Sequence, residues 1–192
     1  MSLKQISIFA AIIGFQLFAP KAKANALSGI WRTGCLQGIS KQQGFTESRS
    51  QTTESFFQDK NCSLPAFQFV TNGEIQFPEQ NSEFINFTYA SVELTVYTQE
   101  VVADFNSRNV CGFSDWQTAQ KKIITGLKCA LFNAKKETQI AKVNDKKFGI
   151  YRLEQDKLYF GQLTREMDGS SPEKRPLKLN PEVYFKSFEP NF

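Results

Sequence analysis

Alternating apolar and polar positions predict that most of this chain folds into β-strands, because one face of such a strand is buried and the other is solvated. The segments with this pattern are 29–31, 45–57, 67–71, 74–77, 83–97, 138–143, 148–153, 158–163 and 183–188. Most of them follow one another closely, as in a meander. We therefore expect a mainly β fold, an antiparallel up-and-down barrel of about eight strands. A more general β-rich or sandwich-like α+β fold is the alternative.

Two positions within these segments predict departures from regular strands. Asn72-Gly73 separates two alternating runs, and this dipeptide favours the type I′ turn of a β-hairpin. In the segment 83–97, the parity of the apolar positions changes halfway. The two sets are Ile85, Phe87 and Tyr89, followed by Val92, Leu94 and Val96. Because strand side chains repeat every two residues, this slip predicts a bulge or bend near Ala90-Ser91.

Helix signals between the strands predict a helical insertion near residues 98–126. Thr98 is a suitable N-cap for a short helix. Ser114 and Gln117 then have the spacing of a capping box ahead of a second apolar stripe, and Gly126 is a natural end for that helix.

The N-terminus has the three parts of a secretory signal peptide. Lys4 precedes an apolar run at 6–18, and the small residues of Ala24-Asn25-Ala26 provide a cleavage site. The apolar run is well short of the roughly 20 residues that span a bilayer. We therefore expect residues 1–26 to be a signal peptide cleaved near Ala26, and 27–192 to be a single β-rich domain. The mature chain would be secreted or periplasmic, without a transmembrane segment.

The four cysteines are an even set in a chain predicted to be exported, so we expect two disulfides. Three pairings are possible for four cysteines. We favour Cys35–Cys62 and Cys111–Cys129, because each of these pairs closes a loop of modest size.

Charge and histidine content narrow the function classes. Residues 1–26 hold three of the 23 basic residues and none of the 19 acids, so the remaining chain is close to neutral. Nucleic-acid binding, which requires clustered positive charge, is therefore not expected. The chain has no histidine, which excludes Ser-His-Asp and Cys-His catalysis and histidine-based zinc sites. No catalytic, metal or cofactor motif is present, and we expect a protein that is not an enzyme.

Gly29-Ile30-Trp31, at the start of the first predicted strand, resembles the Gly-x-Trp motif of the lipocalins and their calycin relatives. The resemblance implies an eight-stranded barrel that Trp31 closes at one end. It also implies a basic residue from the last barrel strand lying across this tryptophan, and Arg165 is the position that matches. The interior of such a barrel can take one small apolar ligand.

The candidate ligand-binding residues are the aromatic side chains expected to line this interior: Phe67, Phe69, Phe87, Tyr89 and Tyr151. We thus expect an exported, non-enzymatic, lipocalin-like binding protein for a small apolar molecule. The alternative is an interaction module with a protein partner, such as a hydrolase inhibitor. In that case the polar loop at 166–176 would bind the partner, with Arg175 as an anion contact.

Overall fold

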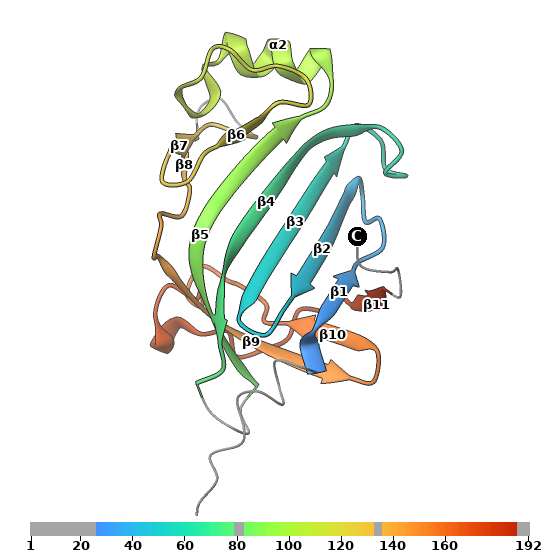
Figure 1. Ribbon diagram of the computed structural model, residues 1–192, viewed down its shortest axis with the longest axis vertical. Helices are drawn as coiled ribbons and strands as arrows, with labels where there is room; N and C mark the ends of the chain where they lie inside the picture. The colour runs from blue at the N-terminus through green and yellow to red at the C-terminus, as the bar shows by residue number, and fades with distance from the viewer. Residues whose placement is uncertain (1–25, 79–82, 133–135, 188–192) are drawn as a thin grey trace, which may run out of the picture.

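The computed structural model describes residues 26–78, 83–132 and 136–187, and these form a mainly β fold (Figure 1). Eight strands make up its main body. They are β1 (Gly29–Arg32), β2 (Ile39–Phe45), β3 (Arg49–Phe57), β4 (Pro65–Gln76), β5 (Phe84–Val96), β9 (Lys146–Glu154), β10 (Lys157–Phe160) and β11 (Tyr184–Ser187).

These eight strands form a closed, antiparallel ring. Each pairs with its neighbour in the order β4-β3-β2-β1-β11-β10-β9-β5, and the pairing of β4 with β5 completes the circuit. Apart from the step from β5 to β9, strands that follow each other in the chain lie side by side. The predicted mainly β, up-and-down arrangement of about eight strands is confirmed.

The ring is uneven in height (Figure 1). β9 pairs with β5 only from Phe84 to Thr88, while the later residues of β5 pair with the short strand β6 (Lys121–Ile123). All eight strands are therefore paired around the ring only at the end near β9 and β10. At the opposite end, β9 does not reach the last residues of β5, and the insertion that carries α2 (Gln99–Ser107) lies against β5 instead.

The bulge predicted in the longest strand is confirmed, whereas the hairpin predicted beside it is wrong. β4 continues through Asn72-Gly73, and there its pairing with β5 shifts by one residue, which leaves Ala90 without a partner. A side chain at Gly73 would overlap the Thr88 carbonyl oxygen and the Phe87 ring. The glycine therefore permits a close approach of two strands rather than a turn.

The first predicted helix of the insertion is confirmed, and the second is wrong. The Thr98 hydroxyl caps α2 by accepting from the Val101 amide at 3.4 Å. After a 3-10 helix, η1 (Val110–Gly112), the chain is irregular, with turns and only short strands, and it contains no second α-helix up to Phe132. The Trp116 backbone amide donates to Asn106 Oδ1 at 2.6 Å, which fixes the backbone where the sequence pattern predicted the second helix.

The remaining elements are short. β7 (Lys128–Cys129) and β8 (Thr138–Gln139) form a separate two-stranded sheet, so the strand predicted at 138–143 is mostly absent. The segment predicted as one strand at 45–57 contains the turn from β2 into β3, and β2 itself was not predicted. A second 3-10 helix, η2 (Pro172–Lys174), lies in the predicted loop. Phe188, at the end of the last predicted strand, lies outside the described residues.

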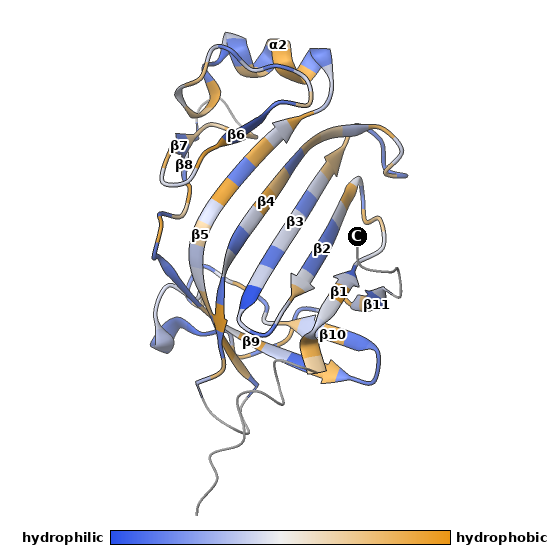
Figure 2. Ribbon diagram, viewed as in Figure 1, coloured by the Kyte–Doolittle hydropathy of each residue, from blue (hydrophilic) through white to orange (hydrophobic). Residues whose placement is uncertain are grey.

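Two apolar cores result from the alternating pattern, which Figure 2 shows along the upper part of β5. The closed-end cluster lies inside the complete part of the ring and contains Leu27, Trp31, Phe45, Ile75, Ile85, Tyr151, Leu158 and Tyr184. The insertion cluster joins β5 to the insertion and contains Val92, Leu94, Val96, Phe105, Val110, Cys111, Trp116, Ile124, Cys129 and Leu131.

Both predicted disulfides are present. The sulfur atoms lie 2.04 Å apart in Cys35–Cys62 and 2.05 Å apart in Cys111–Cys129. Two disulfides indicate an oxidising environment, extracellular or periplasmic. Among the residues that the structure describes, no helix is long and apolar enough to cross a membrane.

Candidate ligand cavity

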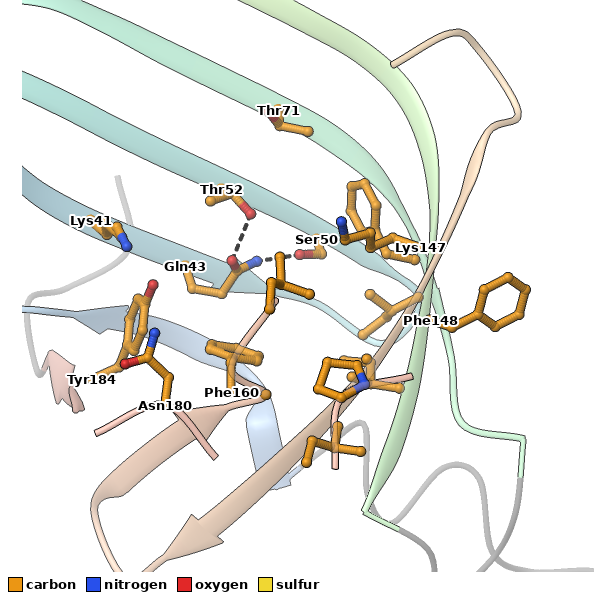
Figure 3. A pocket seen from close by; sticks show the side chains of 18 of the residues that line it. Lys41, Gln43, Ser50, Thr52, Thr71, Lys147, Phe148, Phe160, Asn180 and Tyr184 are labelled. Atoms are coloured by element: carbon orange, nitrogen blue, oxygen red, sulfur yellow. Dashed lines mark hydrogen bonds between the residues drawn. The ribbon is translucent and has the colours of Figure 1, made fainter. Parts of the chain in front are cut away.

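A cavity of about 460 Å³ lies inside the ring next to the closed-end cluster, because Phe45, Ile75, Ile85 and Tyr184 of that cluster contribute to its lining (Figure 3). Strands β2 to β5 and β9 to β11 contribute to its wall, together with the segment from Gly161 to Glu182. Its apolar lining includes Phe45, Ile75, Ile85, Phe87, Ile150 and Phe160. The cavity therefore has the size and much of the apolar lining typical of small-molecule sites.

Its polar wall comes from facing positions of β2 and β3. Lys41 is paired in register with Glu54, and Gln43 with Thr52. Because opposite residues of an antiparallel pair point to the same face, all four side chains turn into the ring, where they line the cavity.

A hydrogen-bonded chain holds the middle of this polar wall in place (Figure 3). The Gln43 amide donates to the Ser50 hydroxyl, and the Thr52 hydroxyl donates to the Gln43 carbonyl oxygen at 2.6 Å. Gln43 and Ser50 are buried. Since their polar groups are paired with each other, this wall can be buried without a large desolvation cost.

Two carboxylates face a single ammonium group at one side of the cavity. Lys41 Nζ lies 2.8 Å from Glu182 Oε2 and 4.0 Å from Glu54 Oε1. Burial raises the pKa of the Glu54 carboxyl above its ordinary value, and the attraction of Lys41, which lowers the pKa, does not offset this. Glu54 is thus an acid whose charged form is poorly compensated.

Lys147 is the other charged group inside the cavity. Burial lowers its pKa, while the charge of Asp168 acts in the opposite direction. Burial also raises the pKa of Tyr184, whose neighbours include Glu182 and Glu54. The common cause of these shifts is burial, because a charged group in the cavity is solvated less well than in water.

The raised pKa of Glu54 predicts a pH-dependent effect of Glu54→Gln on stability. The folded state holds the Glu54 proton more tightly than the unfolded state, so this contribution is complete below pH 4.5 and is lost as pH rises through the raised pKa. Because 41% of the Glu54 side chain is exposed, solvent screens its charge, and we expect only a small effect on the unfolding temperature. We expect E54Q to unfold about 1 °C above wild type near neutral pH and to match it near pH 4 in thermal circular dichroism.

Glu74→Gln is the matched control, because Glu74 is exposed on the outer face of β4. It should leave the unfolding temperature unchanged at both pH values. An advantage of E54Q that grows toward acid pH would contradict the assignment.

The five aromatic residues predicted to line the interior are divided among three places. Phe87 and Tyr89 line the cavity. Phe67 and Phe69 pack against the insertion cluster, and Tyr151 belongs to the closed-end cluster. All five belong to the ring, but their positions along its height differ, and only two reach the cavity.

Trp31 lies in the closed-end cluster, where it is 1% exposed and its indole nitrogen donates to the Leu27 carbonyl oxygen at 2.7 Å. Lys186 lies over it, with Nζ 5.4 Å from the ring centroid. Lys186 belongs to β11, the last strand of the ring, whereas Arg165 is exposed in a turn beyond β10. The choice of Arg165 was wrong because the segment at 158–164 is not the last strand.

Arg175 does not project from its loop as an anion contact would. It is buried over the Phe84 ring, 4.2 Å from the centroid, and it donates to the Ile85 carbonyl oxygen and to Asn86 Oδ1. It therefore fastens the loop at 166–176 to β5. The predicted role as an exposed binding residue was wrong, because the guanidinium group is already engaged by the fold.

The charged lining residues Lys41, Glu54, Lys147 and Glu182 were not identified from the sequence. From the alternation of apolar and polar positions, polar residues of a strand are assigned to the solvated face. The same pattern cannot show that some of them line the interior of the ring. Within the described residues, no group of three or more His, Cys, Asp or Glu side chains is arranged to hold a metal ion.

Compared with protein-family models and with curated proteins, the sequence has no match. The chemistry of the cavity is therefore the best guide to the function of this chain.

Proposed function

We propose that the protein is an exported, non-enzymatic, lipocalin-like binding protein that holds a small and largely apolar molecule in the cavity of the strand ring. In this proposal residues 1–26 are removed as a signal peptide, and the mature chain acts in the periplasm or outside the cell.

The cavity of about 460 Å³ is the observation that carries the proposal. The cavity is partly open to solvent, and its size and its partly apolar lining are typical of sites that take up a small molecule. Aromatic rings from three strands, Phe45, Phe87 and Phe160, face it. Burying an apolar molecule against them is favourable by roughly 25 cal/mol for each Å² removed from water.

The environment of Trp31 gives further support for the resemblance to lipocalins. Trp31 lies in the first ring strand, it is buried at the closed end, and a cation from the last ring strand lies over it. These are the relations that the resemblance implies, with Lys186 in the place expected for Arg165.

Filling part of the cavity should weaken binding of a small molecule. Thr71 lines the cavity from β4, and a tryptophan there would occupy the space next to Thr52. We expect Thr71→Trp to weaken binding of the neutral fluorescent probe N-phenylnaphthylamine by about 10-fold or more, which corresponds to about 1.4 kcal/mol. Fluorescence titration measures the effect, and Thr71→Phe should give a smaller loss.

Thr53→Trp is the control, because Thr53 neighbours the cavity residue Thr52 on β3 but points to the outer face. It should bind the probe as wild type does. Equal affinity of wild type and Thr71→Trp would reject the cavity as the binding site.

A further inference from the structure

Two opposite charges inside the cavity are incompletely compensated. Lys41 and Glu182 form an ion pair at 2.8 Å, whereas Glu54 has only the longer contact of 4.0 Å to Lys41. Among the residues that the structure describes, Lys147 has no carboxylate within ion-pair distance, and the more distant charge of Asp168 does not offset the effect of burial on its pKa. One negative and one positive group are thus available to a ligand.

These two groups lie on different sides of the cavity. Glu54 is paired in register with Lys41, and Lys147 lies on β9 opposite Phe87 of β5. Figure 3 shows Lys41 and Lys147 at opposite sides of the lining. Phe45 and Phe160 also line the cavity, and they provide apolar surface in addition to the two charges.

Burial disfavours the charged forms of both Glu54 and Lys147, so each charge would be stabilised by an opposite charge on a ligand. A ligand with only a positive group would compensate Glu54 and leave Lys147 as it is. A ligand with only a negative group would do the reverse. A molecule that carries both charges compensates both side chains.

We propose that the natural ligand is a small amphoteric molecule, with an ammonium group bound by Glu54, an acidic group bound by Lys147, and an apolar body between them. This inference rests on the proposed function, since it specifies what the cavity holds.

Four probes that share one apolar chain test the inference: ω-aminoundecanoate, undecanoate, undecylamine and undecanol. Isothermal titration near neutral pH should give the tightest binding for ω-aminoundecanoate, by about 10-fold over each singly charged probe, with undecanol weakest. Glu54→Gln should remove its advantage over undecanoate, and Lys147→Met should remove its advantage over undecylamine.

Lys146→Met and Glu74→Gln are the controls, since both side chains are exposed and neither lines the cavity. They should leave the order of affinities unchanged. Undecanol binding as tightly as ω-aminoundecanoate would overturn the amphoteric ligand while leaving a binding cavity in place. Failure of all four probes to bind would also overturn it, and N-phenylnaphthylamine titration would then decide separately whether the cavity binds apolar molecules.

Discussion

Trp31→Ala should lower the free energy of unfolding by about 3–5 kcal/mol, the range typical of removing a large buried aromatic side chain. The indole is almost fully enclosed by the closed-end cluster, and its hydrogen bond to the Leu27 carbonyl oxygen would be lost with it. For a domain of this size, the change corresponds to a decrease of roughly 10 °C in unfolding temperature. Urea unfolding followed by far-UV circular dichroism measures the free energy directly.

Trp31→Phe separates volume from hydrogen bonding. It keeps an aromatic ring in the cluster but removes the donor to Leu27, so its cost should be about half that of the alanine variant or less. If Trp31→Ala unfolded at the same urea concentration as wild type, Trp31 could not be what closes this end of the ring.

Removing the Cys111–Cys129 disulfide should cost about 3 kcal/mol, because it closes a loop with a sequence separation of 18. Both cysteines are buried in the insertion cluster, so the double variant Cys111→Ala/Cys129→Ala also loses packing. We expect the insertion to loosen first. Trp116 lies in that cluster and Trp31 in the other, so tryptophan fluorescence in a Trp31→Phe background reports on the insertion alone.

The control is the double variant Cys35→Ala/Cys62→Ala, which removes the other disulfide and leaves no unpaired thiol. That pair ties an exposed loop at Cys35 and belongs to neither core cluster. Its removal should leave the environment of Trp116 unchanged. The same shift in Trp116 fluorescence from both double variants would argue against a local role for Cys111–Cys129.

Features that depend on local pattern could be predicted from the sequence. The change of parity in β5 showed where a bulge must lie, because a buried face has to be restored after an extra residue. The segments predicted at 148–153 and 158–163 correspond to the paired strands β9 and β10, and the turn between them places Gln155 at a positive φ of 54°.

Features that depend on distant contacts could not be predicted. Asn72-Gly73 has the composition of a turn, but the Phe87 ring needs the space that a side chain at Gly73 would fill. The apolar stripe after Ser114 suits a helix, but β5 offers a strand edge with which residues Lys121–Ile123 pair. In both cases a partner far along the chain overrides the local preference.

The candidate site was predicted only in its apolar part for the same reason. Phe87 and Tyr89 were found because aromatic residues are expected inside a ring of strands. Lys41 and Glu54 sit at inward positions of β2 and β3, and only the register of the two strands shows that they face each other. A sequence pattern gives the parity of a residue but not which parity faces inward.

If the exported chain holds a small ligand in the ring of strands, the ligand should still be bound when the protein is recovered from its own compartment, and native mass spectrometry detects it. We predict a mass above that of residues 27–192 with two disulfides, and we predict that the excess, a single small organic molecule, is released when the protein unfolds. A native mass equal to that of the bare polypeptide would contradict ligand binding in the ring of strands.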